Sequence, residues 1–276
     1  MLGRDVVAAA RAAGAQVIAL TRADLDVTDR DAVAAVAGDR AVAVVVNCTG
    51  WTDVDGAEER EDEALRVNGE GVANLARACR RNGARLLHLS TDYVFSGDGS
   101  APYAEDAPPD PLNAYGRTKL AGEHALRQLL PDRGYVVRTA WLYGEHGPNF
   151  VRTMLRLERE RETLEVVDDQ VGQPTWTADL ARQLVALGTS NAPAGVYHGT
   201  SSGAVSWHGF AAEIFRLIGA DPQRVRTTDS GAFRRPAARP AYSVLGHGTW
   251  KAAGLTPIRP WQETLAEALP QIAAAG

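Results

Sequence analysis

The sequence places a tyrosine and a lysine four residues apart, in Tyr115-Gly116-Arg117-Thr118-Lys119. On a helix, residues with this spacing share one face, so the two side chains would lie close together. An ammonium group beside a phenol favours the phenolate and lowers the pKa of the tyrosine. Tyr115 is therefore a candidate general acid for a carbonyl oxygen. The spacing also arises by chance, so its value depends on the elements around it.

Two hydroxyl side chains, Ser90 and Thr91, directly follow the apolar run 85–89. This run is predicted to be a strand, and ligands of open α/β sheets bind at the carboxyl ends of the strands. Both hydroxyls are thus placed to bind a substrate oxygen. A turn that merely ends the strand would use the same residue types.

These side chains need a scaffold, and the first half of the chain alternates between strand and helix patterns. The run 41–46 is continuously apolar, which is typical of a parallel strand buried on both faces. The alternation predicts an α/β fold with a doubly wound parallel sheet. The predicted strands are 16–20, 41–46, 85–89 and 135–139, and the predicted helices are 1–14, 28–36 (capped by Thr28), 61–82 and 113–130.

After about residue 147 the alternation loosens, which predicts a smaller second α/β lobe. The polar stretch 227–242 contains Pro236, Pro240 and several arginines, and we interpret it as a loop over a site. The predicted elements of this half are helices over 150–161, 177–187, 207–218 and 260–274, with strands over 164–167 and 196–199.

Composition limits the function classes. The chain has 276 residues, of which 45% are hydrophobic and 23% charged, as in an ordinary globular protein. A net charge of −5 argues against a nucleic-acid partner. Cys48 and Cys79 are too few for a disulfide framework, which favours the cytoplasm. We see no apolar run that approaches a membrane span, and the six histidines show no zinc spacing.

Longer sequence blocks carry a resemblance to a known family. The chain resembles the extended short-chain dehydrogenase/reductases and, within them, the dTDP-4-dehydrorhamnose reductase family. The resemblance spans nearly the whole chain. Its most specific blocks are LSTDYVFSG (89–97), PLNAYGRTKLAGE (111–123) and DDQVGQPTW (168–176), supported by VVVNCTGWTDVDGAE (44–58), LRVNGEGVANLA (65–76) and VVRTAWLYG (136–144).

The resemblance implies a Rossmann-like fold and a reduction. Residues 1–146, with 177–200 returning to them, would form the NAD(P)-binding domain, and 147–176 with 201–276 mainly the substrate lobe. Hydride would pass from NADPH, or from NADH, to C4 of a dTDP-4-keto-6-deoxysugar. Tyr115 would protonate the C4 oxygen, Lys119 would tune Tyr115 and hold the nicotinamide ribose, and Thr91 would bind the same oxygen.

The resemblance also implies the remaining site residues. After the run 16–20, no acidic residue stands where it would repel a 2′-phosphate, and Arg22 is near, so NADPH is favoured. The cofactor-binding residues would be Gly3, Arg22, Asp26, Asn47, Cys48 and Thr49, together with Tyr115 and Lys119. The substrate-binding residues would be Thr91, Asp92, Tyr93, Trp141, Asn149, Phe150, Gln170 and Arg239, with Asn68 near the active site.

The chain departs from the family pattern at its start. The family opens with a strand and a G-x-x-G-x-x-G turn, and here Gly3 matches the last of these glycines. We therefore expect a first strand and most of the glycine-rich turn, about ten to twelve residues, to be missing. The turn Cys48-Thr49-Gly50-Trp51 also differs from the Ala-Ala usual in the family.

Two alternatives stay open. One is an epimerase or dehydratase of the same superfamily. The other is a non-catalytic binding subunit like the regulatory β-subunit of methionine adenosyltransferase, which the missing glycine turn would favour. Thr91, Tyr115 and Lys119 favour the enzyme. A homodimer is possible, and magnesium is possible although we find no residue cluster that demands it.

Overall fold

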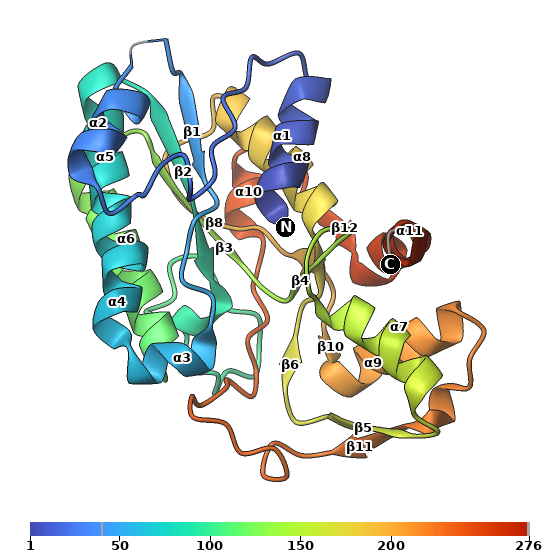
Figure 1. Cartoon of the computed structure of the whole chain (residues 1–276). Helices are drawn as coiled ribbons and strands as arrows, with labels where there is room; N and C mark the ends of the chain where they lie inside the picture. Colours follow the sequence, from blue (N-terminus) through green and yellow to red (C-terminus); the bar gives the residue numbers. More distant parts are fainter. Residues whose placement is uncertain (40, 275–276) are drawn as a thin grey trace.

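The centre of the fold is a parallel sheet (Figure 1). The computed structural model describes residues 1–39 and 41–274. Each strand of the central sheet is parallel to its neighbour, in the order β1-β2-β3-β8, and the predicted parallel sheet is thus confirmed. The strands are β1 (Val44–Asn47), β2 (Arg85–Thr91), β3 (Gly134–Thr139) and β8 (Gly195–His198).

Helices cover both faces of this sheet (Figure 1). Leu86 and Val136 belong to the core on one face, whereas their neighbours Leu87 and Val137 belong to the core on the other. Side chains alternate along a strand, so burial of both faces explains why apolar residues occupy successive positions of these strands. One face carries α2 (Arg30–Ala37), α5 (Gly71–Asn82) and α6 (Ala114–Leu129), and the other carries α1 (Leu2–Ala12), α8 (Thr177–Thr189) and α10 (Gly248–Ala252).

A second core lies in the lobe beyond the sheet (Figure 1). Phe210, Ile214 and Leu265 are fully buried there. The lobe contains α7 (Phe150–Glu160), α9 (Trp207–Leu217), α11 (Trp261–Ala274), η3 (Pro222–Arg224) and the parallel pair β5 (Leu164–Val167) and β11 (Val225–Thr228). Short strand pairs complete it: β4 (Leu142–Tyr143) with β7 (Thr175–Trp176), β6 (Val171–Gly172) with β10 (Val205–Ser206), and β9 (Ser201–Ser202) with β12 (Ile258–Pro260).

The domain boundaries stay predictions. Trp250 and Ile258, which fall in the range assigned mainly to the lobe, pack in the core of the sheet. The last two residues of the range 201–276 lie outside the described residues. Among the described helices, we find none with the length and apolarity that crossing a bilayer requires.

The predicted strand over 16–20 is wrong. This segment is irregular, and Ile18 and Leu20 are 70% and 45% exposed. A strand is stable only beside a hydrogen-bonded neighbour, and in the described residues β1 is the last strand at its end of the sheet. An apolar β-branched sequence therefore remains unpaired here.

The predicted helix over 61–82 is broken into α4 (Glu61–Leu65), a π-helical turn η1 (Arg66–Glu70) and α5, and a short helix α3 (Val54–Glu59) precedes it. The carbonyl of Asn68 in the wide turn lies so close to α6 that a Cβ on Gly122 would collide with it. Tertiary packing against α6 thus accompanies the break. Asp29, rather than Thr28, caps α2, since its Oδ1 accepts from Asp31 N and Ala32 N at 3.0 Å.

Candidate active site

Helix α6 carries a stripe of polar side chains that faces β2. Asn113 caps the helix by accepting a hydrogen bond from Gly116 N at 2.8 Å. Tyr115 and Lys119 are four positions apart on this helix, and Lys119 Nζ donates to the carbonyl of Leu89 at 2.6 Å. The predicted pairing of these side chains on one helix face is thus present, against the carboxyl end of β2.

Gly116, inside the Tyr-x-x-x-Lys motif, permits the close approach of the segment after β2. A Cβ at this position would collide with the carbonyl oxygen of Tyr93. Glycine therefore allows the short 3-10 helix η2 (Asp92–Val94) to lie directly on α6. Tyr93 also meets Tyr115 edge to face, with ring centroids 5.9 Å apart.

Thr91 ends β2 beside Tyr115. Its Oγ1 accepts from Tyr93 N at 3.2 Å and donates to Asp92 Oδ1 at 3.1 Å. The side chain of Thr91 also lies close enough to the phenol of Tyr115 to act on its pKa. Ser90 faces a different partner, because its hydroxyl donates to Glu123 at 2.6 Å. The single hydroxyl hydrogen of Ser90 is thus taken by Glu123, so the structure does not support the expectation that Ser90 donates it to a substrate oxygen.

The protonation states differ from the sequence-based expectation. Burial raises the pKa of Tyr115 to about 12, and the side chain of Thr91 opposes this rise. Burial lowers the pKa of Lys119 to about 8, against the stabilising charge of Glu123. The predicted lowering of the Tyr115 pKa is therefore wrong in direction, because desolvation outweighs the attraction of a cation. At neutral pH Tyr115 is a neutral phenol, which can donate a proton.

The turn after β1 lies beside these groups. Asn47 is buried, and its Oδ1 accepts from Thr49 N at 3.0 Å and from Thr49 Oγ1 at 2.6 Å. Cys48 and Thr49 are exposed. A Cβ on Gly3 would lie 3.7 Å from Cys48 Cβ, and a Cβ on Gly50 would lie 3.6 Å from Lys119 Nζ. The start of α1, this turn and Lys119 therefore meet at one edge of the sheet.

Asn68 connects this turn to α6, the helix that carries Tyr115 and Lys119. It is buried in the π-helical turn η1, and its Oδ1 accepts from Trp51 N at 2.9 Å. Its Nδ2 donates to Thr118 Oγ1 at 3.1 Å. The predicted place of Asn68 near Tyr115 and Lys119 agrees with these contacts.

The other two predicted cofactor residues lie in the loop before α2. Arg22 is exposed. Asp26 Oδ1 accepts from Thr28 N at 2.9 Å and from Thr28 Oγ1 at 2.8 Å, which forms an ordinary Asx turn. Within the described residues, the contacts of Asp26 belong to this loop and do not join it to Tyr115.

Trp141 follows β3 with a left-handed backbone, at φ 45°. This conformation is unusual for a bulky residue and is typical of functional sites. Its indole stacks on Trp207, with ring centroids 3.6 Å apart and an interplanar angle of 9°. The ring of Phe150 lies against Trp207, with ring centroids 4.6 Å apart. Sequence reasoning missed Trp207, whose place at the start of an amphipathic helix resembles ordinary core packing.

Two further substrate candidates make contacts within the lobe. Asn149 caps α7, since its Oδ1 accepts from Arg152 N at 3.1 Å, and its Nδ2 donates to the carbonyl of Gly144 at 2.8 Å. Gln170 Nε2 donates to Ser230 Oγ at 2.7 Å. These contacts explain both residues structurally, and their binding of substrate stays a prediction.

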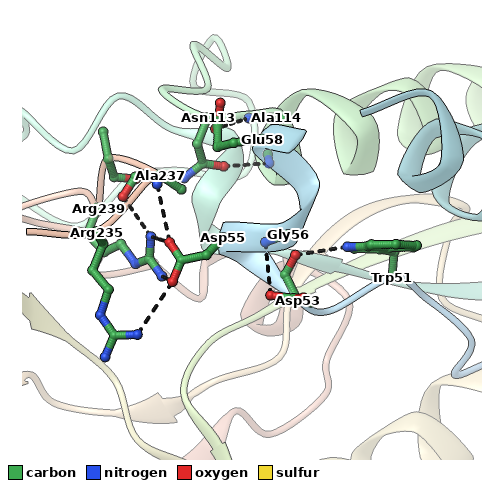
Figure 2. A network of polar contacts seen from close by, with 12 residues as sticks. Trp51, Asp53, Asp55, Gly56, Glu58, Asn113, Ala114, Arg235, Ala237 and Arg239 are labelled. Atoms are coloured by element: carbon green, nitrogen blue, oxygen red, sulfur yellow. Dashed lines mark hydrogen bonds and ion pairs between the residues drawn. The ribbon is translucent and has the colours of Figure 1, made fainter. Parts of the chain in front are cut away.

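Arg239 lies in an ion pair that sequence reasoning missed (Figure 2). Its Nη1 and Nη2 donate to the two carboxylate oxygens of Asp55 on α3, at 2.8 and 3.1 Å. Arg235 reaches the same carboxylate at 3.4 Å, and Ala237 N donates to it at 3.2 Å. Arg239 keeps the pKa of Asp55 below its usual value. The predicted loop over a site is thus fastened to α3.

The arginine loop 234–240 adjoins the catalytic helix. Figure 2 shows Glu58, on the same short helix as Asp55, accepting from Ala114 N, and the distance is 2.8 Å. Asn113 Nδ2 donates to the carbonyl of Ala238 at 2.8 Å. Both Arg239 and Tyr115 influence the pKa of Tyr93 electrostatically, so Tyr93 lies near both of them. The hydroxyls of Thr91 and Tyr115 and the arginine loop 234–240 therefore border one site.

Asp92 is buried beside Thr91, and burial raises its pKa to about 6. Hydrogen bonds from Ser243 and Thr91 act in the opposite direction. Ser243 belongs to the strand-like segment after the arginine loop, where its N donates to Val171 O at 2.9 Å. Ser243 thus brings this part of the lobe near the end of β2. In the described part of the chain, we find no group of three or more His, Cys, Asp or Glu residues arranged for a metal ion.

The parallel sheet with helices on both faces is the fold of the extended short-chain dehydrogenase/reductases. A family model described as the RmlD substrate binding domain matches residues 1–274, and the chain belongs to this family. The family resemblance and the fold class inferred from the sequence are thereby confirmed.

Relatives support the assignment. The chain is 55% identical to a dTDP-4-dehydrorhamnose reductase of Streptomyces griseus, over 99% of this chain and 91% of the relative. It is 55% identical to a dTDP-4-keto-6-deoxy-D-glucose reductase of Streptomyces niveus, over 98% and 93%. A crystal structure of a dTDP-4-dehydrorhamnose reductase from Bacillus anthracis in complex with NADP superposes with a TM-score of 0.91, at 35% identity, covering 98% of this chain and 95% of that one.

Proposed function

We propose that the protein reduces the C4 keto group of dTDP-4-dehydrorhamnose, or of a closely related dTDP-4-keto-6-deoxysugar, with a nicotinamide cofactor. The observation that carries this proposal is the contact of Tyr115 with Thr91 above Lys119. A neutral phenol and a hydroxyl, both fixed at the end of a parallel strand, suit a carbonyl that becomes an alkoxide. Relatives named as reductases of such sugars support the substrate class.

The turn after β1 fits a nicotinamide cofactor. Glycine at position 50 leaves open the space beside Lys119, which a side chain would enter. Lys119 and Tyr115 would hold the nicotinamide ribose, and the exposed backbone of Cys48 and Thr49, with Gly3, would line the rest. The bound cofactor supplies the hydride. The relative crystallised with NADP supports this class of cofactor.

In the proposed reaction, the chain itself positions the keto group and supplies a proton. With substrate bound, Thr91 would turn its hydroxyl hydrogen from Asp92 Oδ1 to the C4 oxygen, and Tyr115 would transfer its phenolic proton to the same oxygen. Lys119 remains an ammonium group below its pKa of about 8, and stabilises the negative charge that develops on Tyr115. Each of these roles requires the short distances that the packing of α6 on β2 provides.

The substrate would lie between the hydroxyl cluster and the lobe. Arg239, with Arg235 beside it, would attract the diphosphate through its positive charge and through the guanidinium hydrogens that Asp55 does not take. The stacked Trp141 and Trp207 would form an apolar wall near the sugar. We expect Asp92, Tyr93, Asn149, Phe150 and Gln170 to complete the binding site.

Preference between the two nicotinamide cofactors is a separate proposal. Arg22 is exposed and free to meet a 2′-phosphate in solvent, so we propose that NADPH is preferred and that NADH is accepted. Asp26 would lie near the adenine. A role for magnesium, a homodimer, a cytoplasmic location and the missing first strand stay predictions.

The direct test incubates the 276-residue chain with dTDP-4-dehydrorhamnose and NADPH, and follows the loss of cofactor absorbance. Nuclear magnetic resonance of the product identifies inversion or reduction at C4. We expect stoichiometric NADPH oxidation and a C4 alcohol. Sugar isomerisation or water loss without net NADPH oxidation would favour the epimerase or dehydratase. Tight NADPH binding without any turnover would favour a regulatory subunit.

A further inference from the structure

A buried ion pair lies next to the face of α6 that carries Tyr115 and Lys119. Arg138 Nε and Nη2 donate to the two carboxylate oxygens of Glu123 at 2.9 and 2.7 Å. The side chains of Arg138 and Glu123 are 3% and 1% exposed. Ser90 Oγ donates to the same carboxylate at 2.6 Å. The proposed reaction does not use any of these three residues.

The position of this cluster in the fold connects it to the active site. Glu123 follows Lys119 by one helical turn and Tyr115 by two, on the same face of α6. Ser90 precedes Thr91 in β2 and pairs in register with Arg138 of β3. One carboxylate therefore joins the catalytic helix to both central strands, one residue from Thr91.

The charges around the cluster are distinctive. Arg138 Nη1 also donates to the carbonyl of Glu105 at 3.3 Å and lies 3.5 Å from His198 Nε2. Burial, and then the charge of Arg138, lower the pKa of His198 to about 3, so this imidazole is neutral. The ion pair of Glu123 and Arg138 is thus in contact with a neutral histidine, His198.

Glu123 also acts on Lys119 at a distance. The titratable groups that influence the Lys119 ammonium are Glu123 on its own helix and Cys48 from the turn after β1. His88 from β2 faces it too, and burial keeps its pKa well below its usual value, so it is neutral. Loss of the negative charge of Glu123 would therefore lower the pKa of Lys119.

We propose that Glu123, clamped by Arg138 and Ser90, is a positioning residue that fixes α6 against β2 and β3 and so holds Tyr115 and Lys119 at Thr91. This proposal rests on the proposed function. It adds an electrostatic consequence, because the same carboxylate keeps Lys119 in its ammonium form at higher pH.

The test needs variants that keep the buried site electrically balanced. Removing one partner of a buried pair leaves an uncompensated charge, whereas replacing both partners is often tolerated. The double variant E123Q/R138M is therefore compared with wild type for turnover of dTDP-4-dehydrorhamnose by NADPH between pH 6 and 10. A matched control is E158Q/R224M, because Arg224 Nη1 and Glu158 Oε1 form an ion pair of 2.7 Å in the lobe.

We expect the high-pH limb of kcat/KM, near the Lys119 pKa of about 8, to move down by about one pH unit in E123Q/R138M. The sign follows because Glu123, and not Arg138, is among the groups that act on Lys119, so the ammonium loses a negative neighbour and gives up its proton at lower pH. We expect kcat at pH 6.5 to fall about tenfold through misplacement of Tyr115. E158Q/R224M should retain the wild-type limb and kcat.

Two single variants separate charge from position and keep the test decisive if the double variant fails to fold. E123D keeps the charge and shortens the side chain, so kcat should fall while the high-pH limb of kcat/KM stays at its wild-type pH. S90A removes one hydrogen bond, and kcat should fall several-fold with the limb unchanged. Wild-type kcat and limb in E123D, S90A and any folded double variant would overturn the role of Glu123. A wild-type chain without turnover would instead overturn the proposed function and this role with it.

Discussion

The two ends of the proposed cofactor site differ sharply in how tightly they are built. Around α6, the side chains of Thr91, Tyr115 and Lys119 are tied to buried backbone and to one another. In the segment before α2, by contrast, Arg22 and Asp26 are exposed and their surroundings are irregular. The catalytic end is thus held in place by contacts within the chain. Among the described residues, Arg22 and Asp26 make no such contacts with the sheet.

This difference shows which kind of sequence signal is reliable. A motif on one helix needs only helix formation to bring its residues together. A strand signal such as 16–20 needs a neighbouring strand as well, and here the described sheet ends at β1. Substitutions at the two ends should therefore differ in size, and four comparisons test this from the largest effect to the smallest.

The largest effect is expected for Tyr115→Phe. The variant lacks the proton donor, so turnover should fall by about 10² to 10⁴ while the ring still packs beside Tyr93. Stopped-flow or steady-state NADPH oxidation measures the loss. Tyr135→Phe is the control, because that hydroxyl donates to the carbonyl of Ala192 at 2.9 Å, away from Thr91. Equal activity of the Tyr115 variant and wild type would refute the catalytic assignment.

Gly116→Ala should destabilise the fold by about 1–3 kcal/mol, since the new Cβ would collide with the carbonyl of Tyr93. Gly3→Ala offers the contrasting case at the other end of the site. Its Cβ would make an ordinary contact 3.7 Å from Cys48, and alanine favours helix α1. Urea unfolding of both variants measures the change. A Gly116 variant as stable as the Gly3 variant would contradict the tight packing at α6.

Arg239→Ala should raise KM for the dTDP-sugar about tenfold and change kcat little, because one charge-assisted contact to the diphosphate is lost. KM for NADPH should stay constant. Arg226→Ala provides a control on the exposed part of β11. If the KM values for the sugar agree in the two variants, Arg239 serves only to fasten the loop to Asp55.

The smallest effect is expected at the exposed end. Arg22→Ala should weaken NADPH binding about threefold and leave NADH binding unchanged, since an exposed cation contributes little in salt solution. Fluorescence titration with each cofactor measures the affinities. A loss that is equal for NADPH and NADH would show that Arg22 does not meet the 2′-phosphate.

Much of the fold could be predicted because its signals are local. A continuous apolar run marks β1, short strand-like runs mark β2 and β3, and the spacing of Tyr115 and Lys119 marks one face of α6. The breaks at residues 59–71 could not be predicted, since the π-helical turn depends on how closely Asn68 approaches Gly122. Trp207 was missed for a similar reason, because it stacks on Trp141, which lies 66 positions earlier in the sequence.

By itself, the sequence determined the parallel sheet, the helix that carries Tyr115 and Lys119, and the family. These follow from periodicity and from motifs whose residues lie near one another in the chain. The tertiary structure alone decided which groups each side chain meets. It turned Ser90 toward Glu123, joined Arg239 to Asp55 and raised the pKa of Tyr115 by burial. Hydrogen-bond partners and desolvation depend on distant segments of the chain, and no local pattern encodes them.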